Sequence, residues 1–139
     1  MTIYTPFKQL EVGRVFPVPP ASFFVTEEIV DAYLEATGDD TPAFRKGAEP
    51  RPAPPTLAAV YMLDALGHFR NPPGGIHTKQ SFKFHRPVYV GDRLESEVRI
   101  LEKYSKKNRD YVAMEIVTRN QRGELVTSGI ITRIWGKEP

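Results

Sequence analysis

The sequence has 139 residues, of which 40% are apolar, and this length and composition are typical of a single domain that covers residues 1–139 around one hydrophobic core. Its 19 Lys and Arg residues nearly balance its 17 Asp and Glu residues, and the net charge of +2 excludes a disordered chain and a nucleic-acid binder that works through strong positive charge. The absence of cysteine excludes disulfide scaffolds, thiol nucleophiles and cysteine metal sites, and three histidines argue against a zinc site, so we expect neither a metal nor a cofactor.

The first elements along the chain are a short strand and a helix. Residues 12–18 are suited to a short strand, and Thr26 is a good N-cap for a helix that has Glu27 and Glu28 in its first turn. Side chains suited to a buried face then recur at helical spacing, at Ile29, Val30, Tyr33, Leu34 and Thr37. Gly38 is well placed to end this helix.

A second helix is predicted from the Pro54-Pro55-Thr56 step to about Gly67. Proline is tolerated in a first helical turn, where the missing N–H has no intrahelical partner to lose. The following residues leave almost no polar face, since residues 57–63 and 65–66 are all apolar or aromatic. A helix that is apolar nearly all round is buried, so we expect the rest of the fold to enclose it.

The second half of the chain is typical of antiparallel strands with one buried face. Apolar residues alternate with others in runs that cover residues 82–85, 94–100, 112–118 and 125–135. Turn residues separate these runs, at Pro87 with Gly91-Asp92, at 105–108 and at 120–123. We interpret Ile131 and Trp135 in the last run as core or dimer-interface residues.

These elements predict an α+β hot-dog fold, in which an antiparallel sheet of about five strands wraps around one long buried helix. A curled sheet of this size usually pairs with a second copy, so we expect a dimer. A ferredoxin-like sandwich is the competing fold. It is disfavoured because its helices alternate with its strands, whereas both helices here precede the main block of strands.

The sequence carries no targeting or membrane-spanning pattern. Residues 1–10 contain Lys8 and polar residues rather than a charged segment followed by an apolar one, which argues against a secretory signal. The longest apolar stretch is interrupted by Asp64 and is too short to span a bilayer. We therefore expect a cytoplasmic protein with no membrane partner.

The chain is rich in proline, and the prolines gather at one place. There are 13 in all, about twice the ordinary usage of roughly 5%, and five of them lie at Pro42, Pro50, Pro52, Pro54 and Pro55. Because proline fixes φ, such a segment loses less entropy when it becomes ordered. The cluster therefore points to the loop between the two helices as the place where a ligand is held, although a merely rigid connection is the plain alternative.

The sequence of this loop resembles a known family. Residues 38–44 read Gly-Asp-Asp-Thr-Pro-Ala-Phe, residues 53–56 read Ala-Pro-Pro-Thr, and residues 85–92 read His-Arg-Pro-Val-Tyr-Val-Gly-Asp. These segments resemble the MaoC-like dehydratases and (R)-specific enoyl-CoA hydratases, whose signature is Gly-Asp-x-Asn-Pro-x-His. The resemblance is greatest to the N-terminal type of MaoC-like dehydratase domain and extends from Thr26 to Trp135 in the same order.

The resemblance implies reversible addition of water to a 2-enoyl thioester, in which an Asp and a His hold the water and move protons. By position, Asp39 is the catalytic carboxylate, and Thr41 takes the place of the Asn that orients it. The N–H groups of Thr56 and Leu57, which we expect to lack intrahelical partners, are candidate donors to the thioester oxygen. The substrate-binding set is therefore Thr41, Phe44, Thr56 and Leu57.

The chain departs from the family at Phe44, which stands where the family has its His. A proton-transfer pair that lacks one member loses about 10²–10⁴ in rate. Three explanations stay open. A second subunit of the same fold supplies the complete pair, His77 or His85 substitutes for the missing residue, or the protein binds acyl thioesters without converting them.

Each of these residues also has a plain structural interpretation. Asp39 and Asp40 can simply cap backbone N–H groups after a helix. His77 and His85 lie on the face opposite Phe82 and Phe84 and are typical of exposed or interface residues. His68 is spaced to pair with Asp64 near the end of the second helix. A basic cluster is formed by Lys103, Lys106, Lys107 and Arg109. Its plain interpretation is a solvated hairpin tip, and its functional interpretation is contact with the phosphates of coenzyme A or with an acidic carrier protein.

The leading hypothesis is a hydro-lyase of the type found in fatty acid metabolism, or a subunit of one. It acts on 3-hydroxyacyl or 2-enoyl groups carried by coenzyme A or acyl carrier protein, as a homodimer or as a heterodimer with a second hot-dog subunit. The second hypothesis is a non-catalytic subunit that binds acyl thioesters. A hot-dog thioesterase ranks third, because the one carboxylate on the buried helix, Asp64, lies well past the helix start.

Overall fold

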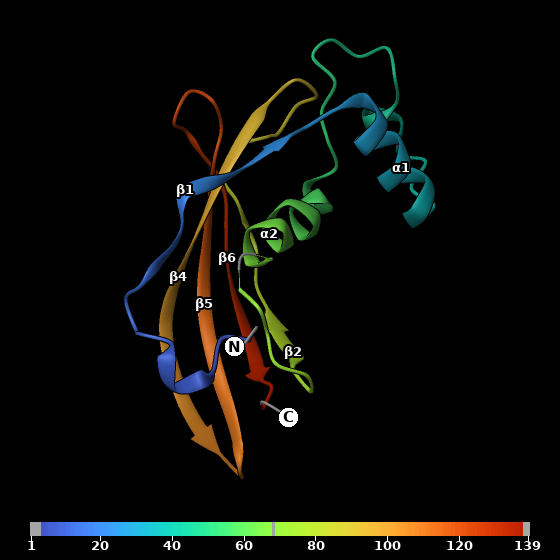
Figure 1. Cartoon of the computed structure of the whole chain (residues 1–139). Coiled ribbons are helices and arrows are strands. Elements are labelled where there is room, and N and C mark those ends of the chain that lie inside the picture. The colour runs from blue at the N-terminus through green and yellow to red at the C-terminus, as the bar shows by residue number, and fades with distance from the viewer. Residues whose placement is uncertain (1–3, 68, 138–139) are drawn as a thin grey trace.

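A computed structural model describes residues 4–67 and 69–137 and has the predicted α+β hot-dog architecture (Figure 1). One antiparallel sheet curls around a central helix, which rules out the ferredoxin-like alternative. The elements in chain order are β1 (Val15–Phe24), α1 (Glu27–Thr37), α2 (Ala58–Leu66), β2 (Ile76–Gln80), β3 (Lys83–Phe84), β4 (Arg93–Lys106), β5 (Arg109–Arg119) and β6 (Leu125–Trp135). Single 3₁₀ turns lie at Phe7–Gln9, Pro42–Phe44 and Pro55–Leu57.

The sheet has the strand order β1-β4-β5-β6-β2, and the short β3 also pairs with β6. The predicted alternation is confirmed on β4 and β5, where every second residue of the runs faces the core and is buried, at Leu94, Ser96, Val98 and Ile100 and at Val112, Met114, Ile116 and Thr118. Both strands continue well past the predicted runs. A tight turn joins the end of β4 to the start of β5 at Lys107 and Asn108, which both have positive φ.

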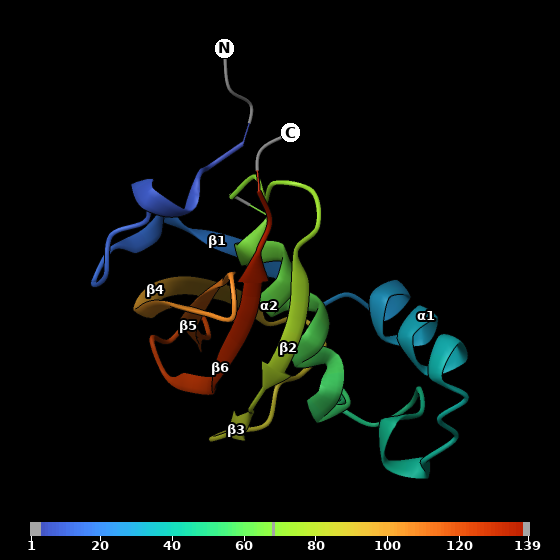
Figure 2. The same cartoon turned by 90° about the horizontal axis from the view of Figure 1, so that it is seen from below.

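Helix α2 lies against the inner face of the sheet, and its buried residues form the centre of the core (Figure 2). Ala58, Met62 and Ala65 have no exposed surface, and Ile131 and Trp135 of β6 complete this core. The expectation that the sheet encloses the helix holds for one side only. On the other side Val60 and Leu63 are 40% and 46% exposed.

Helix α1 forms as predicted but stands apart from the sheet (Figures 1 and 2). The Thr26 side chain accepts a hydrogen bond from the Ile29 N–H at 3.2 Å, which caps the helix. Gly38 ends it in the left-handed conformation, with φ of 66°. Val30 is the buried residue of this helix, and Ile29, Tyr33 and Leu34 are half-buried and pack against the edge of the core.

The sheet edges differ from prediction. Strand β2 was not predicted, because all of its five residues are exposed and no apolar alternation marks it. The strand expected over 12–18 instead covers ten residues that include Pro17, Pro19 and Pro20. Proline is compatible with this strand because β1 lies at the edge of the sheet, and its register shifts between Phe16 and Ala21.

Candidate functional site

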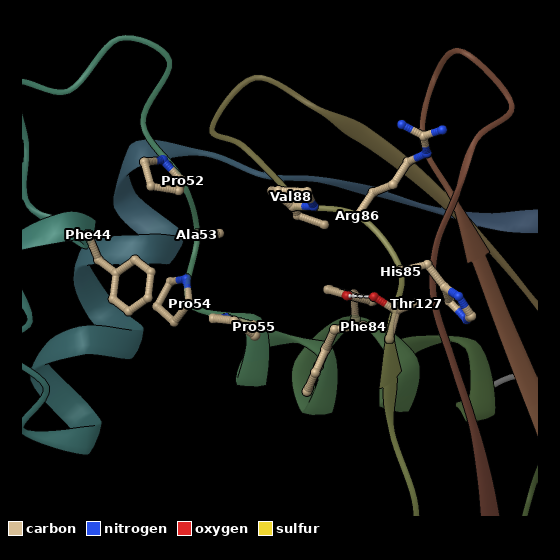
Figure 3. A pocket seen from close by; sticks show the side chains of 12 residues that line it. Phe44, Pro52, Ala53, Pro54, Pro55, Phe84, His85, Arg86, Val88 and Thr127 are labelled. Carbon is tan, nitrogen blue, oxygen red and sulfur yellow. Dashed lines mark hydrogen bonds between the residues drawn. The ribbon is translucent and has the colours of Figure 1, made fainter.

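A pocket of about 300 Å³ lies between the loop after α1 and the end of the sheet nearest to it (Figure 3). Its walls are mostly apolar and come from the 3₁₀ turn after α1, the chain before α2, α2 itself, β3 with the chain after it, and β6. We call this cavity the Phe44 pocket; it is lined by Phe44, Pro52, Ala53, Pro54, Pro55, Tyr61, Phe84, His85, Arg86, Pro87, Val88 and Thr127. The proline cluster thus supplies three of the lining residues.

Backbone hydrogen bonds fix the rim of the pocket. The Ala53 N–H donates to the Val88 carbonyl at 2.7 Å, and the Val90 N–H donates to the Arg51 carbonyl at 2.8 Å. These bonds join the chain before α2 to the chain that leads into β4. Proline is tolerated at positions 52 and 54 because both of these bonds are donated by other residues, Ala53 between the prolines and Val90 on the facing segment. Neither bond needs a proline N–H.

Arg51 ties α1 to this rim. Its side chain is 3% exposed and donates to Glu27, to Asp31 at 2.8 Å, and through Nε to the Phe44 carbonyl at 2.9 Å. The hydrogen bonds from Arg51 and Lys46 hold the pKa of Asp31 below its ordinary value. Sequence reasoning missed this residue, although Glu27 and Asp31 lie one helical turn apart and therefore offer two carboxylates on one face.

Asp39 lies directly after α1, outside the Phe44 pocket. Its Oδ1 accepts hydrogen bonds from the Thr41 N–H at 2.9 Å and from the Thr41 hydroxyl at 2.5 Å. The hydroxyl and then the N–H lower the pKa of Asp39, so it is a carboxylate at neutral pH. The bond from the Thr41 N–H confirms the plain interpretation, that Asp39 caps a backbone N–H, whereas the role of Thr41 as an orienting residue stays a prediction. Neither Asp39 nor Thr41 lines the pocket.

The start of α2 differs from prediction in one respect. Leu57 was expected to have a free N–H, but this group donates to the Pro54 carbonyl at 2.9 Å. The reason is that the helix opens with a 3₁₀ turn, whose hydrogen bonds join residues three apart. The Leu57 side chain is buried in the core. Thr56 is exposed, and its hydroxyl accepts a hydrogen bond at 2.7 Å from Tyr33 of α1.

The histidines described by the structure are exposed, as predicted. His77 lies on β2, away from the pocket, whereas His85 lines it and forms a 2.8 Å hydrogen bond with Ser128. Neither ring is hydrogen-bonded to Asp39. Asp64 is exposed on α2 and does not line the pocket. Its predicted partner, His68, lies outside the described residues.

The basic cluster lies at the tip of the β4–β5 hairpin, at the end of the sheet opposite to α1 (Figure 1). Three of its members are exposed, in agreement with a solvated hairpin tip. Lys103 is half-buried, because it lies 4.7 Å from the centre of the Phe7 ring and donates to the Phe7 carbonyl. This position is remote from the Phe44 pocket.

Comparison with known proteins establishes the family. Residues 11–128 match the dehydratase domain region of the FAS1-like family. The chain belongs to the FAS1-like dehydratases. It is 30% identical to a UPF0336 protein of Cutibacterium acnes over 142 residues, which cover 93% of each chain. The resemblance to MaoC-like dehydratases and enoyl-CoA hydratases is thereby confirmed.

Solved structures of this hot-dog group agree with the assignment. The R-hydratase PhaJ1 of Pseudomonas aeruginosa is 27% identical, with a TM-score of 0.82 over 96% of this chain and 86% of the hydratase. A chain of the HadBC complex of Mycobacterium tuberculosis, a 3R-hydroxyacyl-ACP dehydratase, is 26% identical. Its TM-score is 0.73, with coverage of 88% of this chain and 96% of the HadBC chain. This member of the FAS1-like dehydratase family therefore shares its fold with an R-hydratase and with a chain of a dehydratase complex.

Among residues 4–67 and 69–137, no helix is long and apolar enough to cross a membrane. Within the same ranges, His, Asp and Glu side chains form no cluster of three that could hold a metal ion.

Proposed function

We propose that the chain is a subunit of an acyl-thioester hydratase or dehydratase. It binds a 2-enoyl or 3-hydroxyacyl group carried by coenzyme A or acyl carrier protein, and a second hot-dog subunit with a complete Asp–His pair carries out the turnover. The observation that best supports this proposal is the position of Phe44. The side chain that replaces the family His forms a wall of the apolar pocket, where it is suited to contact an acyl chain and cannot transfer a proton.

The remaining residues of the loop are assigned by the same proposal. In hydration, the oxygen of water bonds to the β-carbon of the enoyl group while a proton is delivered to the α-carbon. Asp39, which Thr41 holds as a carboxylate, is the group that would position such a water at this chain's own site. The Thr56 N–H is the donor we assign to the thioester oxygen, since the Leu57 N–H is already used.

Pairing with a second subunit is supported by the surfaces left open. Val60 and Leu63 expose apolar surface on the side of α2 that the sheet does not cover. Within the described residues, strand β2 ends the sheet with an unpaired edge, and its Ile76 is 53% exposed. An exposed edge and an apolar helix face are features that a second hot-dog subunit covers. We propose that this pair acts in the cytoplasm.

The proposal is tested by following the absorbance of crotonyl-CoA. The chain is assayed alone and mixed with a family member from the same genome that carries an intact Gly-Asp-x-Asn-Pro-x-His motif. We expect activity from the mixture that exceeds that of the chain alone by about 10² or more. Replacing the His of the partner's motif by Ala abolishes it. Full activity of the chain alone, unchanged in the D39N variant, contradicts the proposal.

Assays of the chain alone distinguish two further hypotheses. If His85 substitutes for the missing His, the chain alone is active and H85A removes that activity, whereas H77A does not. Release of free coenzyme A thiol from acyl-CoA substrates favours a thioesterase instead. The exposed position of Asp64 outside the pocket gives that reading no support.

A further inference from the structure

The Phe44 pocket contains one buried polar pair in a largely apolar wall. The Tyr61 hydroxyl on α2 and the Thr127 hydroxyl on β6 lie 2.5 Å apart, and the two residues are 2% and 1% exposed. The other polar side chains of the lining are those of His85 and Arg86. Both are exposed, and they are bound to Ser128 and Glu124, respectively. Figure 3 shows them directed away from the side on which Phe44 lies.

Counting hydrogens shows what this pair can still do. Each hydroxyl has one hydrogen to donate, and the bond between Tyr61 and Thr127 uses one of the two. Among the described residues, neither hydroxyl has another hydrogen-bond partner. One O–H is therefore left to donate at the wall of the cavity. Burial raises the pKa of Tyr61 to about 12, so this side chain stays protonated and does not act as a base at neutral pH.

We infer that the Tyr61–Thr127 pair is a specificity element that recognises an oxygen on the acyl chain, so that the pocket favours a 3-hydroxyacyl thioester over the same chain without the hydroxyl. A buried donor that meets only methylene groups loses the hydrogen bonds it had with water. An acyl hydroxyl restores one of them. The inference rests on the proposed function, because it assumes that the Phe44 pocket receives the acyl group.

The chain contains a matched control for this pair. Ser96 of β4 and Thr118 of β5 form a second hydroxyl pair at 2.7 Å, equally buried on the inner face of the same sheet. Thr118 is also the cross-strand neighbour of Thr127. Neither Ser96 nor Thr118 lines the Phe44 pocket. Loss of the second pair therefore reports the cost of removing buried hydroxyls while both hydroxyls of the proposed element stay in place.

The experiment titrates 3-hydroxyhexanoyl-CoA and hexanoyl-CoA into the protein by calorimetry, while the enoyl absorbance verifies that neither ligand is converted. We expect wild type to bind the hydroxylated ligand about fivefold to tenfold more tightly. The Y61F/T127V variant loses this ratio, and the S96A/T118V control keeps it. If the double variant does not fold, the single variants Y61F and T127V replace it, and the one that removes the outward hydroxyl loses the preference.

The outcomes separate this inference from the proposed function. Equal affinities of wild type for the two ligands, or a ratio that survives in Y61F/T127V, overturn the inference alone. Absence of binding by either ligand overturns the proposed function and the inference with it. A ratio that falls equally in S96A/T118V assigns the effect to general loosening of the core and contradicts the inference.

Discussion

The Asp39–Thr41 turn and the Phe44 pocket are neighbours in the sequence but are built in opposite ways. The turn depends on hydrogen bonds between residues two apart, and its groups lie toward the solvent. The pocket brings together residues 44 to 127 from several separate segments, and its deepest side chains are buried. The position of the carboxylate thus depends on local sequence, whereas the wall of the Phe44 pocket needs the whole fold. A chain built in this way can lack the family His at one position and still keep its pocket.

The largest expected effect comes from restoring the missing side chain. In F44H, an imidazole replaces the ring that follows the Asp39–Thr41 turn, while the Arg51 bond to the backbone carbonyl of residue 44 can remain. We expect hydration of crotonyl-CoA by the chain alone to rise by about 10²-fold over wild type. F44H/D39N should return to the wild-type level, and F44L controls for loss of the phenyl ring. A folded F44H without any gain shows that the turn is not poised for catalysis.

The next effect concerns the link between the two regions. R51M removes the cation that joins Glu27 and Asp31 to the Phe44 carbonyl, so α1 and the pocket wall lose their common anchor. We expect the free energy of unfolding to fall by about 1–3 kcal/mol and the affinity for acyl-CoA to fall with it.

The matched control is R93M, because Arg93 forms an exposed ion pair with Glu95 on the sheet. That variant should lose at most about 1 kcal/mol and keep its affinity for acyl-CoA. Urea unfolding and calorimetric titration measure both quantities. Equal effects of the two substitutions would contradict the role of Arg51 as the anchor between α1 and the pocket wall.

The smallest expected effect is a change in how the free energy of unfolding depends on pH. The folded pKa of Asp31 lies below its ordinary value of 3.8, so its contribution to stability is present above that value and is lost as the pH falls through the folded pKa. D31N should therefore be less stable than wild type at pH 7 and lose less stability on acidification.

Comparison with D39N tests whether the turn differs from the anchor in this respect. The pKa of Asp39 is also lowered, but by neutral groups two residues away that an unfolded chain can also bring near. D39N should thus change the pH dependence of stability less than D31N does. Urea unfolding at pH 7 and at pH 3 measures the difference, and a larger change in D39N is the contrary result.

The same contrast explains what could be predicted from the sequence. Helix α1 could be placed to the residue, because its cap at Thr26 and its stop at Gly38 are local signals. Asp39 and Thr41 were identified instead by the resemblance of residues 38–44 to the family signature, and their roles stay predictions. Strand β2 escaped prediction because an edge strand with no buried face has no apolar period.

Features made by long-range contacts could not be read from any one segment. The two acidic partners of Arg51 lie 20 and 24 residues before it. The Tyr61–Thr127 pair joins residues 66 apart, across α2 and β6. The error at Leu57 has a local cause instead, since consecutive prolines predicted free N–H groups but not the tighter 3₁₀ turn that uses one of them. The sequence thus pointed to the proline-rich loop beside which a pocket lies, whereas the long-range contacts that shape the pocket could not be predicted.

The most direct test of the central claim is a titration of the purified chain with hexanoyl-CoA, butyryl-CoA and free coenzyme A. If the Phe44 pocket receives the acyl group, each buried methylene adds about 0.8 kcal/mol, so hexanoyl-CoA should bind about tenfold more tightly than butyryl-CoA. Free coenzyme A should bind most weakly. Equal affinities for the three ligands, or no binding at all, would contradict the claim that this chain is an acyl-thioester-binding subunit.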